Sequence, residues 1–398
     1  MAQFDSKSFN EKAFKYSVGR VPNMKMNEIK KSKALAANPE IKSVFADQNG
    51  TAYAKIAMRG LIDGEAVNYD GKTDIEATRT KTFERGVVVV GRAKAWIETD
   101  FSYEITGGVD FMQNVADQVA EYKDGLDQDT ILAVMKGIFA MSTGAKNKEF
   151  VTKHTYDITN MVDGNCGLST LNSATNQACG ANKKKFTMIF MHSDVATNLE
   201  NKRLIEHLKY TDKDGVTREL DLYTWNGKLV IVDDDMPTED IKAHYIKCDA
   251  TVKGALKVVA NDVADVNPGE IKVSDTKVTG IAAGDYVFAI PASTKYTSYA
   301  LGTGSIDYED VGVKHPYSMS RDEKTNGGED TLYMRQRKVY APFGLSYEKK
   351  NQASLSPTDE ELADGANWSL VCSGEANESE RSYINHKAIP ICRIVSRG

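Results

Sequence analysis

The sequence predicts a mixed α+β fold with more than one domain, and three observations support this prediction. The chain has 398 residues, enough for two or three cores of ordinary size. Residues 86–98 alternate between the two faces of a strand, with the period of two that a half-buried β-strand shows. Residues 110–142 carry apolar side chains at helical spacing, and shorter strand-like and helix-like segments alternate over 186–232.

The first 45 residues predict an extended arm. They are polar, contain Pro22 and Pro39, and show no sustained periodicity, so at most one short helix is expected, at 26–37. Such an arm gains little by packing on its own domain, and we expect it to lie across a neighbouring subunit. No apolar run near the start is typical of a signal peptide, which predicts a protein made and kept in a cytoplasm.

A long β-hairpin is predicted to follow the arm. Its strands are expected at 52–61 and 86–98, and they flank a polar segment, 63–84, that contains Asp-Gly turns at Asp63 and Asp70. A free two-stranded ribbon is only marginally stable in water. We therefore expect the tip of the hairpin to rest on an adjacent subunit.

The clearest helix is predicted to begin at Asp110, which has Gln113 three residues later as in a capping box. If the helix continues to Ser142 it is about 50 Å long, at 1.5 Å per residue, and should act as a structural spine. Gly125 weakens its middle by roughly 1 kcal/mol relative to alanine, which is consistent with a bend there.

An α/β segment is predicted next, in which Ser193 or Asp194 caps a helix that runs to about Leu208. Asn226-Gly227 is the strongest short signal of a β-hairpin. These features predict a mixed sheet with helices packed on it, with strands at 186–192, 217–223 and 228–232.

The rest of the chain is predicted to be mainly β-structure. Residues 241–287 contain short strand-like runs interrupted by turns, which indicates a β-rich insertion on the outer surface of the sheet domain. Strands are expected at 331–340 and 388–395, and a small helix at 357–362 is expected to begin at Pro357.

Charge and cysteine content exclude several classes of protein. The net charge is −6 with acids and bases interspersed, whereas a protein that grips DNA phosphates needs a concentrated basic surface. The one sharp basic run, Lys183–Lys185, is predicted to be a solvated loop before a strand. The five cysteines lie far apart without a C-x-x-C pair, so separate reduced thiols are expected and zinc is not.

Three short motifs resemble catalytic or ligand-binding sites, but the sequence supports none of these functions. His192-Ser193-Asp194 cannot form a triad, because adjacent residues cannot converge on one reacting atom. Asp233–Asp235 would point to alternate faces of a strand, so an acidic turn is favoured over a metal site. Gly302-Thr303-Gly304-Ser305 lacks the Lys-Ser/Thr of a phosphate-binding loop. We predict no catalytic, cofactor-binding or metal-ligating residue, and no enzyme activity.

Several stretches in a consistent order resemble one family, the major capsid proteins of tailed bacteriophages with the Hong Kong 97-type fold. Residues 224–237 (TWNGKLVIVDDDMP) are similar to the hairpin of that family, with its Asn-Gly turn, its acidic end and a nearby proline. The other similar stretches are Tyr69–Ile75, Val90–Trp96, Asp110–Tyr122, Met191–Ser193, Asn201–Ile205, His315–Tyr317, Ser356–Thr358 and Asn367-Trp368.

The resemblance implies an N-terminal arm, an extended hairpin loop, a spine helix in a peripheral domain, and an axial α/β domain. The corresponding ranges are an arm at 1–45, the loop at 46–107, the spine helix and peripheral domain at 108–185, the axial domain at 186–310 with its insertion at 241–287, and return strands at 311–398. Because only about 45 residues precede the hairpin, we expect any scaffold to be a separate protein.

The resemblance also implies a function: a subunit that assembles as hexamers and pentamers into an icosahedral shell around double-stranded DNA. The expected partners are other copies, a scaffolding protein, a portal and a decoration protein, together with packaged DNA bound without sequence specificity, and no membrane. The expected location is the virion, after assembly in the bacterial cytoplasm. Assembly contacts are expected at five residues: Asp70, Gly71, Lys72, Arg92 and Trp96.

Three alternatives remain open from the sequence. An encapsulin, a bacterial compartment with the same fold, would enclose an enzyme cargo, and the long arm and hairpin favour a phage protein over it. A tail or other virion protein would form tubes or rings. A metal-dependent hydrolase that uses His192 and Asp233–Asp235 would lose its activity to a chelator.

Overall fold

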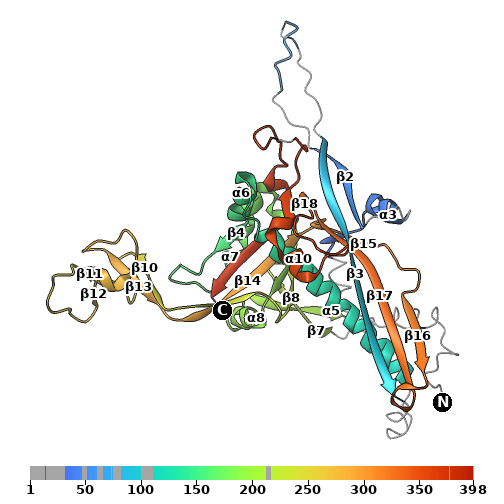
Figure 1. Cartoon of the computed structure of the whole chain (residues 1–398). Coiled ribbons are helices and arrows are strands. Elements are labelled where there is room, and N and C mark those ends of the chain that lie inside the picture. The colour runs from blue at the N-terminus through green and yellow to red at the C-terminus, as the bar shows by residue number, and fades with distance from the viewer. Residues whose placement is uncertain are drawn as a thin grey trace. The chain divides into compact units, whose positions relative to one another are not determined.

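A computed structural model describes residues 14, 32–46, 52–60, 66–72, 74, 82–99, 111–211, 217–375 and 377–397. The chain divides into two compact units. Unit 1 comprises residues 1–151 and 303–389, and unit 2 comprises residues 152–302 and 390–398. Both units contain helices and a β-sheet, which confirms the mixed α+β class (Figure 1).

The sheet of unit 1 is built around two long antiparallel strands, β3 (Thr82–Thr99) and β17 (Glu329–Pro342). Four shorter strands complete it in the order β1-β15-β17-β3-β2, with β16 also paired to β17: β1 (Leu35–Ala36), β15 (Ile306–Asp310), β2 (Tyr53–Arg59) and β16 (Tyr317–Asp322). Residues 87–90 of β3 are four consecutive valines that are almost completely buried, so both faces of the sheet are covered at this point.

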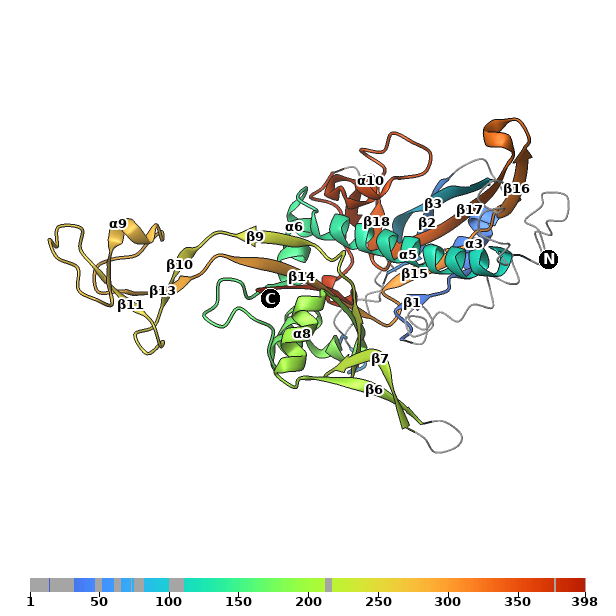
Figure 2. The ribbon, with the colours of Figure 1, turned by 90° about the horizontal axis from the view of Figure 1, so that it is seen from below.

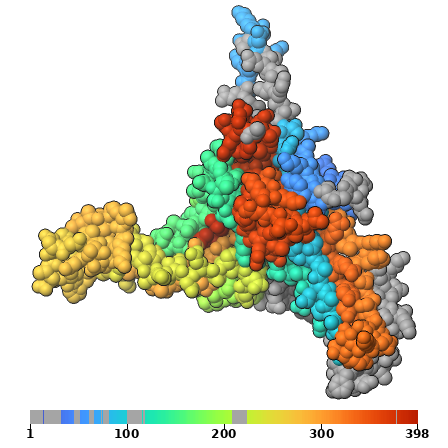
Figure 3. Space-filling model, viewed as in Figure 1, coloured from blue at the N-terminus to red at the C-terminus, as the bar shows by residue number. Residues whose placement is uncertain are grey.

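The predicted hairpin is present as β2 and β3, paired from Tyr53 with Val88 to Arg59 with Thr82. Beyond this hairpin β3 continues along β17 as far as Thr99. Half of its predicted tip, 63–84, lies outside the described residues, but 66–72 are described, and they form the blue end at the top of Figure 3.

The predicted spine helix is α5 (Phe111–Phe139), 29 residues long. It lies along the long strands of unit 1 (Figure 2). Its C-terminal part approaches a short C-terminal segment very closely, because a Cβ added at Gly137 would lie 2.0 Å from the carbonyl oxygen of Leu362. Leu362 belongs to the short helix α10 (Asp359–Ala363). The other elements of this part of unit 1 are α6 (Ala145–Lys153), β18 (Leu345–Tyr347) and β19 (Trp368–Leu370).

The arm packs on its own unit more than expected. Leu35 and Ala36 form β1 beside β15, and α3 (Pro39–Ala46) buries Ile41 and Phe45 against the valines of β3. Phe14 is also buried, against the side chain of Tyr317. The expectation of an arm that gains little from its own domain is therefore wrong for these residues, because each apolar side chain finds a cluster of unit 1 to cover.

The helix expected at 26–37 is not present in the part of this range that the structure describes, residues 32–37. Residues 26–31 lie outside the described residues, and 33–37 form a turn followed by β1. The helix instead begins at Pro39, where the side chain of Asn38 accepts a hydrogen bond from the backbone N–H of Glu40, and proline fits a first helical position.

Unit 2 is built on a sheet with strand order β4-β20-β14-β5-β8-β7-β6, and β9 also pairs with β14. The strands are β4 (Thr155–Asp157), β20 (Ile391–Arg397), β14 (Ser293–Gly302), β5 (Phe186–Met191), β8 (Lys228–Val232), β7 (Thr217–Trp225), β6 (Ile205–Thr211) and β9 (Thr238–Ile241). The helices α7 (Thr170–Cys179) and α8 (Ser193–Asn201) contribute to one buried apolar cluster with the sheet. Asn226 and Gly227 join β7 to β8 with φ values of 51° and 72°, as a tight hairpin turn requires.

Two helix boundaries differ from the prediction. His192 is the N-cap of α8, because its side chain accepts the backbone N–H of Asp194, and the helix ends at Asn201 rather than near Leu208. Arg203 then adopts a φ of 56°, which turns the chain into β6. In unit 1, Thr358 rather than Pro357 opens α10, through a capping box with Glu361.

The β-rich insertion is a separate small sheet with strand order β10-β13-β11-β12. Its elements are β10 (His244–Cys248), β11 (Leu256–Val259), β12 (Glu270–Lys272), α9 (Val273–Thr276) and β13 (Tyr286–Ile290). Val258, Val287 and Ile290 are its buried aliphatic residues. The prediction of β-structure over 241–287 is thus confirmed, although β13 extends past its end.

Candidate functional site

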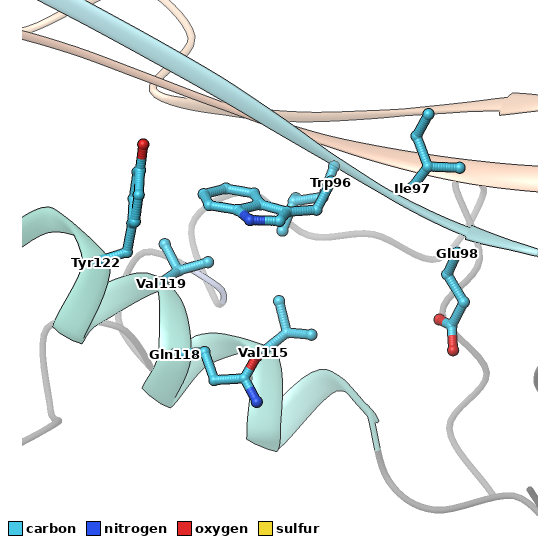
Figure 4. A pocket seen from close by; sticks show the side chains of 8 residues that line it. Trp96, Ile97, Glu98, Val115, Gln118, Val119 and Tyr122 are labelled. Atoms are coloured by element: carbon cyan, nitrogen blue, oxygen red, sulfur yellow. The ribbon is translucent and has the colours of Figure 1, made fainter.

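An apolar groove lies between the end of β3 and the N-terminal half of α5 in unit 1. Its volume is about 270 Å³, and it is lined by Trp96, Ile97, Glu98, Val115, Gln118, Val119, Tyr122 and Leu332. Trp96 and Tyr122 meet edge to face, with ring centroids 5.3 Å apart (Figure 4). Tyr122 is 37% exposed, so the groove offers an aromatic side chain to solvent, and Ile97 beside it is 61% exposed.

The sequence periods explain how this groove forms. Trp96 and Glu98 share one face of β3, and Figure 4 shows both pointing toward α5 while Ile97 points to the other side. Val115, Val119 and Tyr122 are spaced by four and three residues, which places them on one face of the helix. One strand face and one helix face therefore face each other across the groove.

Phe14 packs in a buried cluster with residues that also line the groove. Val115, Val119 and Leu332 belong both to the groove and to the buried cluster that contains Phe14. The Phe14 ring meets that of Tyr317 edge to face at 5.0 Å. Nothing in the periodicity of the arm predicted the position of Phe14, because a single aromatic residue in a polar segment has no pattern.

The residues predicted as assembly contacts do not gather in one place. Asp70, Gly71 and Lys72 form an exposed turn, in which the Lys72 N–H donates to the Asp70 carboxylate at 2.9 Å. Trp96 lies in the groove. Thr82 and Trp96 are 14 residues apart on one strand, about 46 Å at 3.3 Å per residue. Lys72 lies ten residues before Thr82, at most about 36 Å of extended chain, so one chain cannot bring its turn to its own groove.

Arg92 has an intrachain role that the sequence did not predict. Its guanidinium donates to the carbonyl oxygens of Gly91 at 3.0 Å and Pro357 at 2.9 Å, and to the Asp359 carboxylate at 2.6 Å. The Ser356 hydroxyl accepts the Gly91 N–H at 2.8 Å beside it. Arg92 therefore ties the loop before α10 to β3.

A buried polar cluster fixes α5 to the sheet of unit 1. The Lys338 ammonium lies 2.7 Å from one Asp127 carboxylate oxygen, which also accepts the Tyr340 hydroxyl at 2.7 Å. The Tyr308 hydroxyl donates to the other oxygen at 3.1 Å. Burial, and then the nearby Asp127 charge, raise the pKa of Tyr340. No local pattern indicates this cluster, because Asp127 lies 181 or more residues from its partners.

A second buried pair holds the base of the hairpin. The Arg85 guanidinium on β3 donates to the Asp307 carboxylate on β15 and to the carbonyl oxygen of Ala341 on β17, both at 2.5 Å. Arg85 is 6% exposed and Asp307 9%. Three strands of unit 1 are therefore locked in register at this point.

The three motifs that resembled catalytic or ligand sites have structural roles. His192 Nδ1 accepts the Asp194 backbone N–H at 3.1 Å as the N-cap of α8, and the Ser193 hydroxyl lies farther from this nitrogen, at 3.5 Å. Asp233 is buried and accepts the backbone N–H of Asp235, whereas Asp234 and Asp235 are exposed in a turn. Gly304 has a φ of 67° within a turn. Within the described ranges, no group of three or more His, Cys, Asp or Glu side chains could hold a metal ion, and no helix could span a membrane.

Comparison with known proteins gives one sequence relative and several similar structures. No family model matches the chain. The chain is 24% identical over 336 residues to the major capsid protein of Bacillus phage SPP1, and the alignment covers 84% of each protein. Similar solved structures include the capsid of Ralstonia phage GP4 (TM-score 0.45, 8% identity, 87% of this chain and 84% of that one). The cyanophage Pam1 capsid is also similar (TM-score 0.43, 10% identity, 89% and 87%).

Proposed function

We propose that this chain is the major capsid protein of a tailed bacteriophage and that many copies of it build the icosahedral head. The observation that carries the proposal is the match to the SPP1 major capsid protein over 84% of both chains. This match also confirms the resemblance and the virion location that the motifs predicted. The protein is thus a structural subunit and not an enzyme.

The finer anatomy of the Hong Kong 97-type fold is part of the proposal. In unit 1, the β2–β3 hairpin would be the extended loop, α5 the spine helix, and residues 1–45 the arm. The sheet of unit 2 would be the axial domain, and the small sheet its insertion. The two compact units support a two-part division, but unit 2 begins at Thr152, earlier than the axial domain expected at 186–310, and it includes 390–398.

We assign the subunit contacts of hexamers and pentamers to the two ends of the hairpin strand. At one end Tyr69 is 88% exposed and Val67 45%, and at the other end Tyr122 is 37% exposed in the Trp96 groove and Ile97 is 61% exposed beside it. Because a single chain cannot join these surfaces, the contact would be between copies and head to tail. A contact of this type closes into rings when the rotation between copies allows.

The remaining proposed partners are DNA, for which the charge of the chain supplies an argument, and the proteins that the family resemblance implies. A net charge of −6 suits a wall that encloses DNA without gripping it, since strong attraction would oppose packaging and release. We expect no sequence-specific DNA contact. A separate scaffolding protein, a portal and a decoration protein complete the proposed set of partners.

Electron microscopy of the purified protein, expressed alone and with a candidate scaffolding protein, tests this proposal. Closed shells of uniform diameter support it, and double-stranded DNA inside virions that contain this chain separates a phage head from an enzyme compartment. Tubes, or a monomer or dimer under every condition, would overturn it.

A further inference from the structure

A loop of unit 2, residues 158–169, exposes an unusual amount of apolar surface. Leu168 is 68% exposed, Met161 46% and Val162 40%. Among the described residues of unit 2, only Val266 adds a further large apolar side chain exposed to this degree. Single exposed apolar residues are ordinary, but three within eight positions indicate an interaction surface.

One buried arginine holds the first half of this loop. Arg397 is 8% exposed, and its guanidinium donates to the carbonyl oxygens of Met161 at 2.7 Å and Val162 at 3.0 Å. The backbone N–H of Arg397 donates to the Gly164 carbonyl oxygen at 2.8 Å. A Cβ at Gly164 would lie 2.0 Å from Arg397 Nε, so the guanidinium can pack here only against a glycine.

Side chains from other elements of unit 2 hold the second half of the 158–169 loop. The Lys202 ammonium donates to the Cys166 carbonyl oxygen at 3.0 Å, and the Asn226 amide donates to that of Leu168 at 3.4 Å. The apolar side chains thus project from a backbone that is already ordered. A surface ordered before binding loses less conformational entropy when a partner docks.

Unit 2 also carries a basic surface, whereas the surface of the 158–169 loop is apolar with two acidic residues nearby. The short 3₁₀ helix η1 (Gly180–Lys185) directly follows α7 and exposes Lys183, Lys184 and Lys185. The loop and its preceding strand carry Asp157 and Asp163. Lysine stems can cover apolar side chains while their ammonium groups reach carboxylates, so the two surfaces are complementary. They lie at opposite ends of α7, about 15 Å long, which favours contact between copies rather than within one chain.

We propose that the 158–169 loop of one copy docks on the Lys183–Lys185 turn of the next copy. This inference rests on the proposed function, because a shell places identical subunits side by side. It assigns unit 2 a heterologous contact of its own, separate from the hairpin contacts of unit 1. Lys183–Lys185, expected from the sequence to be a solvated loop, would then contact the 158–169 loop of the neighbouring copy.

Cysteine crosslinking in assembled shells tests the pairing. The variant carries Met161→Cys and Lys184→Cys, with the half-exposed Cys248 and Cys372 changed to serine. A short bismaleimide should produce a ladder of dimers, trimers and longer chains, because a head-to-tail contact continues from copy to copy. Each single-cysteine variant, the matched control, should produce no ladder. Normal shells from the double variant that yield no ladder would overturn the pairing.

Serine substitution tests whether the apolar side chains matter. M161S/V162S/L168S should keep the thermal midpoint of the unassembled subunit and slow shell assembly about tenfold or more, since apolar burial is lost only in the contact. Val266→Ser is the matched control and should assemble normally. Gly164→Ala displaces Arg397 and should also slow assembly, although it leaves every exposed apolar side chain in place. If wild type forms shells and the triple variant assembles as fast, this inference fails and the proposed function stands; if wild type forms none, the proposed function fails.

Discussion

Asp127 on α5 and Lys338 on β17 form a buried ion pair between residues 211 positions apart. The side chains are 3% and 7% exposed, and Tyr340 and Tyr308 donate to the same carboxylate. A buried pair of this kind fixes one position of the helix along the strand, because any shift leaves a charge without its partner in a medium that solvates charge poorly. The spine helix is therefore anchored to the sheet by polar as well as apolar contacts.

Removing one member of this pair should destabilise unit 1 strongly. Lys338→Met leaves the Asp127 carboxylate buried without its cation, and we expect a loss of about 3–5 kcal/mol in the free energy of unfolding. The double variant Asp127→Leu/Lys338→Met should recover most of that loss, because neither charge then remains. Urea unfolding of the unassembled subunit measures both. Equal losses in the single and double variants would show that the pair itself is not what holds the helix.

Two glycines of α5 should respond oppositely to alanine. At Gly137 a Cβ would meet the Leu362 carbonyl oxygen at 2.0 Å and the Trp368 indole nitrogen at 2.5 Å, so Gly137→Ala should lower stability by about 1–3 kcal/mol or more. At Gly125 a Cβ would meet nothing within 4 Å, so Gly125→Ala should raise stability by up to about 1 kcal/mol. Thermal melts of the two matched variants compare them directly, and a stabilising Gly137→Ala would contradict the close approach.

Phe14 should contribute to the stability of the single chain. Its side chain is 4% exposed and meets Tyr317 edge to face, so Phe14→Ala should cost about 3 kcal/mol, at the lower end of values for buried phenylalanine. Tyr69→Ala is a control of similar size at a position that is 88% exposed, and it should leave the unfolding midpoint unchanged. Equal midpoints for the two variants would mean that the arm does not pack on its own unit in solution.

Local patterns predicted the elements that local physics determines. The hairpin strands and the spine helix follow from periods of two and 3.6, and the β7–β8 turn follows from the positive φ values that Asn226 and Gly227 tolerate. The end of α8 could not be found this way, because 205–208 also suits a helix and only pairing with β7 makes it a strand. Asp127 and Lys338 likewise reveal nothing until the fold brings them together.

Local sequence periods predicted single residues of the candidate groove but not their arrangement. Trp96 stood out in an alternating strand, and Tyr122 was recognised at helical spacing, but neither period says which strand face meets which helix face. Arg92 shared the alternation with Trp96 and was grouped with it. Tertiary contact separates the two, because Arg92 binds the loop before α10 while Trp96 remains at the surface of the groove.

Buried tyrosines should make the subunit unstable at alkaline pH. Burial, and next the nearby Asp310, raise the pKa of Tyr317 to about 12, above its usual value of 10. The folded state therefore keeps a proton that the unfolded state releases, so this contribution to stability is complete below pH 10 and is lost as pH rises toward 12. Urea unfolding at pH 9, 10 and 11 should show the decline. Tyr317→Phe should flatten it, and an unchanged slope in that variant would assign the decline to other groups.

The final prediction separates folding from assembly at the two ends of β3. Tyr69→Ser and Ile97→Ser change side chains that are 88% and 61% exposed, so each should leave the free energy of unfolding within about 0.5 kcal/mol of wild type. If the hairpin turn of one copy docks over the groove and the exposed Ile97 beside it in another copy, both variants should nevertheless slow shell formation, whereas Leu355→Ser, at a 78% exposed position of the same unit, should not. Because the two surfaces belong to one contact, the double variant should slow assembly by less than the product of the two single effects. Light scattering during assembly measures the rates of wild type, the two single variants, the double variant and the control. Strictly multiplicative effects of Tyr69→Ser and Ile97→Ser would mean that the turn and the groove contact different partners.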